Sequence, residues 1–177
     1  MIKERYHNDV NVSRLNTATP RAYYVPFGTP EEAKKNDRYD SSRVKLLSGN
    51  RWAFKYFESY EDIPENIVDP TISLSEWDKI PVPSNWQLQG FDKPQYINTR
   101  YPFPVNPPFI PKNTPAGVYA IDFTTYDDIA VFNKYIVFEG VDSCLYLYIN
   151  GKFVGYSEGA HNTAEFNLTD YLVKGEN

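Results

Sequence analysis

The chain has 177 residues, a formal net charge of −5 and a single cysteine, Cys144. This length fits one domain with an extension, which can bury roughly two thirds of its unfolded surface. The negative charge and the absence of a Lys/Arg run exclude a nucleic-acid partner, and one cysteine excludes an internal disulfide. The sequence has no apolar run of membrane-spanning length and no signal-peptide core near its start, so we expect no membrane partner and a cytoplasmic protein.

Residues 1–45 are polar and weakly periodic, which is typical of an extended N-terminal arm. Within the arm, the run T-P-E-E-A predicts a short helix from about Pro30 to Lys35. Thr29 can cap this helix, and Glu32 can complete a capping box. Aromatic side chains of the arm must be buried, either on this domain or against another domain or subunit. They are Tyr23, Tyr24 and Phe27.

From Leu46 onward the apolar residues recur with a period of two, as in β-strands. The alternating segments are R-W-A-F-K-Y-F from Arg51, V-Y-A-I-D-F from Val118, K-Y-I-V-F-E from Lys134 and C-L-Y-L-Y-I from Cys144. Asn150-Gly151 follows the last of these and predicts a hairpin with a type I′ turn. Short strands without an amphipathic helix predict an all-β fold, either a β-sandwich or a jelly roll. We therefore expect a jelly-roll domain at 46–177.

The stretch from Ile80 to Tyr119 is dense in proline and aromatic residues. Proline excludes a helix, and so many aromatic residues are unusual in a solvated tail. The motifs are W-D-K-I from Trp77, V-P-S-N-W-Q from Val82, G-F-D-K-P from Gly90, Tyr96, Asn98, Tyr101-Pro102 and N-P-P-F-I-P from Asn106. This pattern resembles the N-terminal domain of the family-2 β-galactosidases. The similarity extends to the arm (L-N-T-A-T-P-R-A-Y-Y-V-P-F) and to the later segments N-G-K-F-V-G-Y-S and A-E-F-N-L-T-D-Y-L.

The resemblance implies a galactose-binding-domain-like jelly roll with its arm, belonging to an enzyme that hydrolyses terminal β-D-galactosides such as lactose with retention. In that family the catalytic glutamates and most magnesium ligands lie in a downstream TIM-barrel domain. We therefore assign no catalytic residue and no metal ligand to this chain. Magnesium, with sodium as a second candidate, is implied only for the parent enzyme, as is a homo-oligomer. Gly175-Glu176-Asn177 resembles a turn entering a further strand, so we expect a fragment truncated before its last strand or strands.

By the same resemblance, Asn98 binds galactose hydroxyls, since an amide offers two donors and two acceptor lone pairs. Judged from its loop alone, Asn98 is a turn-forming residue. Thr99 is a plausible wall of the same pocket. Tyr96 and Tyr101 flank Asn98 and are either sugar-stacking or core residues, whereas Trp86 is expected in the core.

Other candidates favour a structural role. His7 and His161 lack the spacing of metal ligands, and Cys144 is expected to be a small buried residue. Where the family carries an arginine and an aspartate, this chain has His161 and Asn167, which removes the charges of any interdomain ion pair made by those residues. Two other functional classes remain open: a stand-alone carbohydrate-binding module, and a structural sandwich whose aromatic residues are all core.

Overall fold

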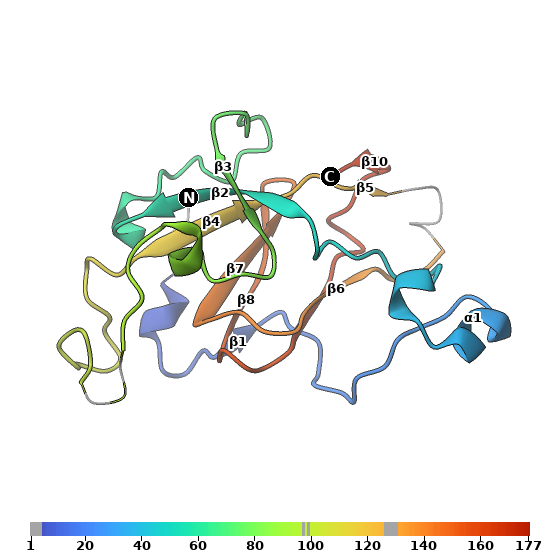
Figure 1. Cartoon of the computed structure of the whole chain (residues 1–177), viewed down its shortest axis with the longest axis horizontal. Helices are drawn as coiled ribbons and strands as arrows, with labels where there is room; N and C mark the ends of the chain where they lie inside the picture. The colour runs from blue at the N-terminus through green and yellow to red at the C-terminus, as the bar shows by residue number, and fades with distance from the viewer. Residues whose placement is uncertain (1–4, 97, 99, 126–130) are drawn as a thin grey trace.

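The fold is described from a computed structural model, which describes residues 5–96, 98, 100–125 and 131–177 (Figure 1). Two three-stranded antiparallel sheets dominate it. In one, β2 (Arg51–Phe57) lies between β3 (Asp78–Pro81) and β4 (Ala116–Ala120). In the other, β8 (Lys152–Glu158) lies between β1 (Arg14–Leu15) and β7 (Cys144–Ile149).

Smaller elements complete the fold. Two two-stranded sheets pair β6 (Tyr135–Phe138) with β9 (Ala164–Asn167) and β5 (Thr124–Thr125) with β10 (Gly175–Glu176). The helices are short: α1 (Pro30–Lys35) and the 3₁₀ turns η1 (Tyr6–Asn8), η2 (Arg38–Asp40), η3 (Tyr60–Asp62) and η4 (Trp86–Gln89). Among the described residues, no helix is long and apolar enough to cross a bilayer. These elements confirm the expected all-β fold.

The hairpin predicted at Asn150-Gly151 joins β7 to β8. Asn150 has φ 51° and Gly151 has φ 75°, which are the positive values that a type I′ turn requires. The two strands pair antiparallel, with a register shift between Leu147 and Tyr148. The sequence thus predicted both the turn and the strands that it joins.

The first core lies against the β7–β8 hairpin and β9. Its buried members are Leu147, Ile149, Val154, Ala164, Phe166 and Leu168. Strand β1 of the arm lies against β8 here because position 155 is a glycine. A Cβ on Gly155 would lie 2.5 Å from the backbone oxygen of Leu15 and 2.6 Å from the ring of Phe166.

The second core lies on one face of the β2–β4 sheet, around Ala53, Ile67 and Trp77. The strand expected through Phe123 is shorter than predicted, because β4 ends at Ala120. Beyond it, Phe123 packs against the first core instead. The chain therefore leaves one sheet to bury an apolar side chain beside the other.

Helix α1 forms over the predicted residues, but its capping differs from the prediction. The Thr29 hydroxyl accepts a hydrogen bond from the backbone N–H of Glu32 (3.2 Å), as expected. The Glu32 carboxylate, however, accepts from the N–H groups of Gly28 (2.9 Å) and Ser42 (3.1 Å). These bonds lower the pKa of Glu32, because they favour its charged form. Glu32 thus connects the start of α1 to the chain after η2.

The arm binds the domain through polar contacts and through Tyr6, whose ring packs on Tyr156 at 5.5 Å, whereas Phe27 is half-buried and Tyr23 and Tyr24 lie outside. The Asn16 amide donates to the backbone oxygen of Val154 (2.8 Å), and Arg21 forms an ion pair with Glu165 (2.7 Å). Tyr23 and Tyr24 stay exposed by 60% and 59%. Packing on this domain therefore does not bury these two side chains, although the domain boundary at residue 45 itself stays a prediction.

Candidate functional site

The part of the motif-bearing segment that follows β3 forms the 3₁₀ turn η4, on the face of β2 opposite the second core. The Trp86 ring lies with its centroid 6.0 Å from that of Phe54 and 5.9 Å from that of Tyr56. The Phe91 ring contacts Phe54 at 4.8 Å. Gly90 ends η4 with φ 93°, and the N–H of Phe91 donates to the Trp86 carbonyl (3.1 Å). Trp86 is half-buried in aromatic packing and belongs to neither of the two cores, so it is more accessible than the core position predicted from the sequence.

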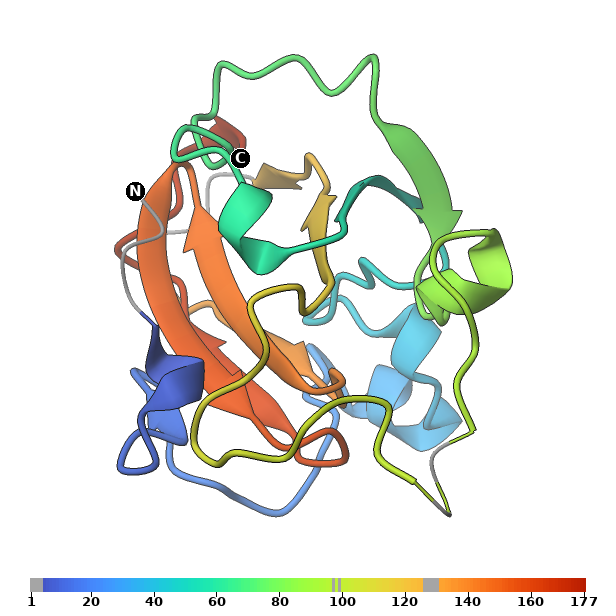
Figure 2. The same cartoon turned by 90° about the vertical axis from the view of Figure 1, so that its left-hand side faces the viewer.

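Residues 92–109, here called the proline-rich loop, follow this anchored turn. The loop rejoins the domain at residues 110–114. The N–H of Tyr60 donates to the Thr114 carbonyl (2.9 Å), and the Ser59 hydroxyl donates to the Lys112 carbonyl. The Ile110 N–H reaches the side-chain oxygen of Asn8 at 3.4 Å. Figure 2 shows the loop, in yellow-green, passing along the outside of the molecule between η4 and β4.

Large aromatic and aliphatic side chains of the loop face solvent. Tyr96 is exposed by 83% and Tyr101 by 71%. The others are Phe103, Val105 and Phe109. Several large apolar side chains exposed on one loop are typical of a surface that contacts a ligand or another protein. The structure therefore contradicts a purely structural reading in which all the aromatic residues are core.

The four predicted site residues are only partly brought together. The exposed Asn98 donates from its amide nitrogen to the Tyr96 hydroxyl at 2.7 Å. Tyr101 lies instead beside Phe103, with ring centroids 6.4 Å apart. Thr99 falls outside the described residues. The contact orients Asn98, and among the described residues no hydrogen bond to its carboxamide oxygen is seen, so this oxygen can accept from a ligand hydroxyl. The binding roles of these residues stay predictions.

A small hollow of about 240 Å³ lies at the start of the loop. Its lining is uncharged and combines three carboxamides with two apolar side chains: Asn85, Gln87, Gln95, Leu88 and Pro94. Amides can donate to and accept from hydroxyl groups without introducing a net charge. The hollow therefore has the chemistry of a surface that contacts a neutral polyhydroxylated ligand.

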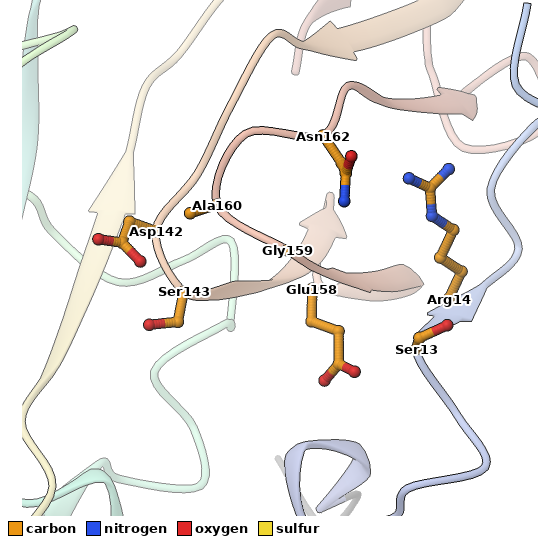
Figure 3. A pocket seen from close by; sticks show the side chains of 8 residues that line it. All are labelled: Ser13, Arg14, Asp142, Ser143, Glu158, Gly159, Ala160 and Asn162. Atoms are coloured by element: carbon orange, nitrogen blue, oxygen red, sulfur yellow. The ribbon is translucent and has the colours of Figure 1, made fainter.

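A larger hollow of about 500 Å³ lies at the open end of the β7–β8 hairpin (Figure 3). Its lining residues are Ser13, Arg14, Asp142, Ser143, Glu158, Gly159, Ala160 and Asn162. None of them is a predicted site residue. The Glu158 carboxylate accepts a hydrogen bond from the Tyr156 hydroxyl (2.7 Å). The hairpin that turns at Asn150-Gly151 brings Ser143 beside Gly159, whose N–H donates to the Ser143 carbonyl (3.0 Å). This pairing was not used to predict the hollow from the sequence.

The remaining chemical candidates take structural positions. His7 lies against β7, with its Nδ1 2.8 Å from the Tyr146 hydroxyl. Burial lowers the pKa of His7, since it disfavours the charged ring. Cys144 is half-buried, so its side chain is more accessible than predicted. Among the described residues, no group of three or more His, Cys, Asp or Glu side chains could hold a metal ion.

The family is decided by a match over most of the chain. Residues 44–177 match the family model described as "Glycosyl hydrolases family 2, sugar binding domain". The chain belongs to this family. The β-galactosidase of Actinobacillus pleuropneumoniae is 44% identical over 178 residues, covering 100% of this chain and 17% of that protein. The β-galactosidase of Priestia megaterium is 43% identical, covering 97% of this chain and 17% of that protein.

Solved structures agree with the fold of this sugar-binding domain. A family 2 glycosyl hydrolase from Bacteroides cellulosilyticus aligns with a TM-score of 0.52 at 20% identity, over 76% of this chain and 16% of that one. A β-glycosidase from Bacteroides vulgatus aligns with a TM-score of 0.51 at 22% identity, over 72% of this chain and 15% of that one. The chain spans about a sixth of the length of the curated relatives.

Proposed function

We propose that this chain is the N-terminal sugar-binding domain of a β-galactosidase that hydrolyses terminal non-reducing β-D-galactose residues with retention. The observation that carries this proposal is the alignment of the whole chain with a β-galactosidase at 44% identity. Because that relative is about six times longer, most of the proposed enzyme, including its catalytic domain, lies in a downstream part of the same polypeptide.

The role of this chain in the proposed enzyme is scaffold and one wall of the galactose subsite. Retaining hydrolysis needs two carboxyl groups about 5–5.5 Å apart on either side of the scissile bond. In this proposal a downstream TIM barrel supplies both. The proline-rich loop adds the Asn98 amide, which is exposed and oriented by the Tyr96 hydroxyl. Thr99 and Tyr101 complete the proposed contact surface.

The proposed enzyme has further partners. Magnesium, with sodium as a second candidate, is assigned to the downstream domain, where it would supply positive charge near the substrate. The exposed Tyr23 and Tyr24 of the arm support a homo-oligomer, because they offer aromatic surface to a second subunit or domain. A single cysteine, which allows no disulfide within the chain, supports a cytoplasmic location.

The proposed function is tested with the full-length protein and three chromogenic substrates: a β-galactoside, a β-glucoside and a β-glucuronide. We expect the β-galactoside to have the highest kcat/KM, and NMR of the first-formed product to show the β-anomer of galactose. Preference for the glucuronide or the glucoside would overturn the substrate assignment while leaving the family membership intact. Formation of the α-anomer first would overturn retention.

A further inference from the structure

The position of the proline-rich loop is set from its two ends. From Asp92 to Pro107, every described side chain is exposed. The hydrogen bond of Asn98 is made to Tyr96, within the loop itself. Nothing described between Phe91 and Pro108 is therefore buried against the sheets. Of the two attachments, the one formed by Trp86 and Phe91 lies nearer in sequence to Asn98.

The attachment at Trp86 depends on a glycine in the adjacent strand. A Cβ on Gly117 of β4 would lie 2.5 and 2.7 Å from two atoms of the Trp86 indole, and 2.6 Å from the Phe54 ring. Atoms that close cannot coexist, so any other residue at 117 must displace one of these rings. Gly117 is not among the glycines with positive φ. The position requires glycine for space rather than for backbone conformation.

Packing alone holds the indole in place. Its Nε1 is buried and has no hydrogen-bond partner among the described residues. An unpaired buried donor costs free energy, so the indole nitrogen adds no directional contact here. The position of the ring is therefore set by the surfaces that it packs against, Phe54, Tyr56 and the backbone of Gly117.

We propose that Trp86 and Gly117 are positioning residues for galactoside hydrolysis. Their contact fixes the start of the proline-rich loop and so fixes where the loop presents Asn98. The inference rests on the proposed function, since it takes Asn98 as the residue that meets the sugar. It adds that one of the two attachments that set the placement of Asn98 depends on β4, through the absence of a side chain at position 117.

The test is a double-mutant cycle in the full-length enzyme, with Gly117→Ala, Asn98→Ala and the double variant. Misplacing a substrate contact by about 1 Å costs up to a hundredfold in rate, so we expect Gly117→Ala to lower kcat/KM by about ten- to a hundredfold. In the Asn98→Ala background the same substitution should have almost no further effect on kcat/KM, because the amide that it displaces is already gone. Its effect on Tm should be equal in both backgrounds.

A matched control is Gly155→Ala, which introduces the same crowding in the other sheet, 2.5 Å from the Leu15 oxygen. We expect it to lower Tm while kcat/KM per folded enzyme stays within about twofold, as for a site that does not couple to Asn98. If Gly117→Ala does not fold, Trp86→Phe makes a milder change: it shrinks the ring, removes the unpaired nitrogen and should show the same dependence on Asn98.

The outcomes separate the two proposals. Equal losses of kcat/KM with and without Asn98 would overturn the positioning role and leave the proposed function intact. So would a loss of Tm without a loss of kcat/KM. An Asn98→Ala variant with unchanged kinetics would overturn the role of Asn98, and the positioning role with it. A full-length protein that does not hydrolyse β-galactosides would overturn the proposed function itself.

Discussion

The β7–β8 hairpin and the proline-rich loop are both rich in aromatic residues, but the hairpin buries its aromatic side chains wholly or partly and the loop exposes them. In the hairpin, Tyr146 and Tyr156 pack with ring centroids 4.8 Å apart, and Tyr156 is fully buried. In the loop, Tyr96 and Tyr101 face solvent. The hairpin backbone is paired along both strands, whereas prolines remove donors from the loop. In these two regions, the aromatic side chains on the paired backbone are packed against one another, and those on the unpaired backbone are accessible to a ligand.

The largest expected effect is a complete loss of catalysis in the isolated chain. A purified sample of residues 1–177, assayed with a chromogenic β-galactoside and magnesium, should show no turnover, because the carboxylate pair belongs to the proposed downstream domain. Circular dichroism would check that the chain is folded. Turnover that survives removal of host enzymes would contradict the assignment of catalysis to another domain.

A second prediction concerns the stability of the two regions. Phe166 is fully buried in the first core, so Phe166→Ala should lower the free energy of unfolding by about 3–5 kcal/mol. The matched change Tyr101→Ala in the loop should stay within about 0.5 kcal/mol. Urea unfolding of both variants measures the difference. Comparable losses would show that the loop is part of the cooperative core.

The third prediction concerns Asn98 in the full-length enzyme. Asn98→Ala should lower kcat/KM for galactosides by about ten- to a hundredfold, the effect of losing one or two hydrogen bonds to the sugar. Its Tm should not change, since the side chain is exposed. If those bonds strengthen in the transition state, Asn98→Ala lowers kcat in addition to raising KM. Asn113→Ala, the same change at an exposed turn outside the loop, is the control, and equal effects of the two variants would make Asn98 a turn residue only.

A fourth prediction concerns the affinity of the isolated chain for galactose. The isolated chain should bind galactose with a Kd in the millimolar range or weaker, about 4 kcal/mol, because Asn98 offers only two or three hydrogen bonds of about 1 kcal/mol each. NMR titration with galactose measures this, and glucose serves as the control sugar. A micromolar Kd would favour a stand-alone carbohydrate-binding module.

The smallest effect is expected at His7, beside the hairpin. Its pKa is lowered from 6.5, first by burial and then by the charge of Arg5, while the charge of Glu158 raises it. The folded state thus binds a proton at His7 less readily than the unfolded state. The free energy of unfolding is therefore unaffected by this group above pH 6.5 and decreases as the pH falls below 6.5. Between about pH 7.5 and about pH 5.5, the Tm of His7→Gln should decrease less than the Tm of the unsubstituted protein. An equal decrease in Tm in both proteins would exclude His7 as the cause of the destabilisation at acid pH.

Local signals in the sequence predicted much of this fold. Helix α1 follows from Thr29 and Pro30, and the hairpin follows from Asn150-Gly151, because each signal acts on residues beside it. Signals that depend on distant partners were missed. Strand β4 ends at Ala120 and Phe123 packs against the first core, which alternation along the chain alone cannot show.

In the candidate site, too, contacts between sequence neighbours were predicted and contacts between distant segments were not. The resemblance pointed to Asn98 and Tyr96, which are neighbours in sequence and in space. The contact of Trp86 with Gly117 joins two segments far apart in the chain, so no local pattern reveals it. The hollow around Arg14 and Glu158 likewise requires β1 to lie beside β8. Such features depend on which strands pair, and that information is spread over the whole sequence.

The pairing of β1 with β8 also has a consequence for the order of synthesis. Contacts between the arm and its partners join residues 138 and 144 positions apart, as in Asn16 with Val154 and Arg21 with Glu165. At about 5–20 residues per second, the arm leaves the ribosome on the order of 10 s before β8 exists. An unpaired edge is an aggregation hazard, and here the strand that covers it is made first. The part of the β8 edge at Tyr156 and Ser157 can therefore pair with β1 as soon as β8 leaves the ribosome.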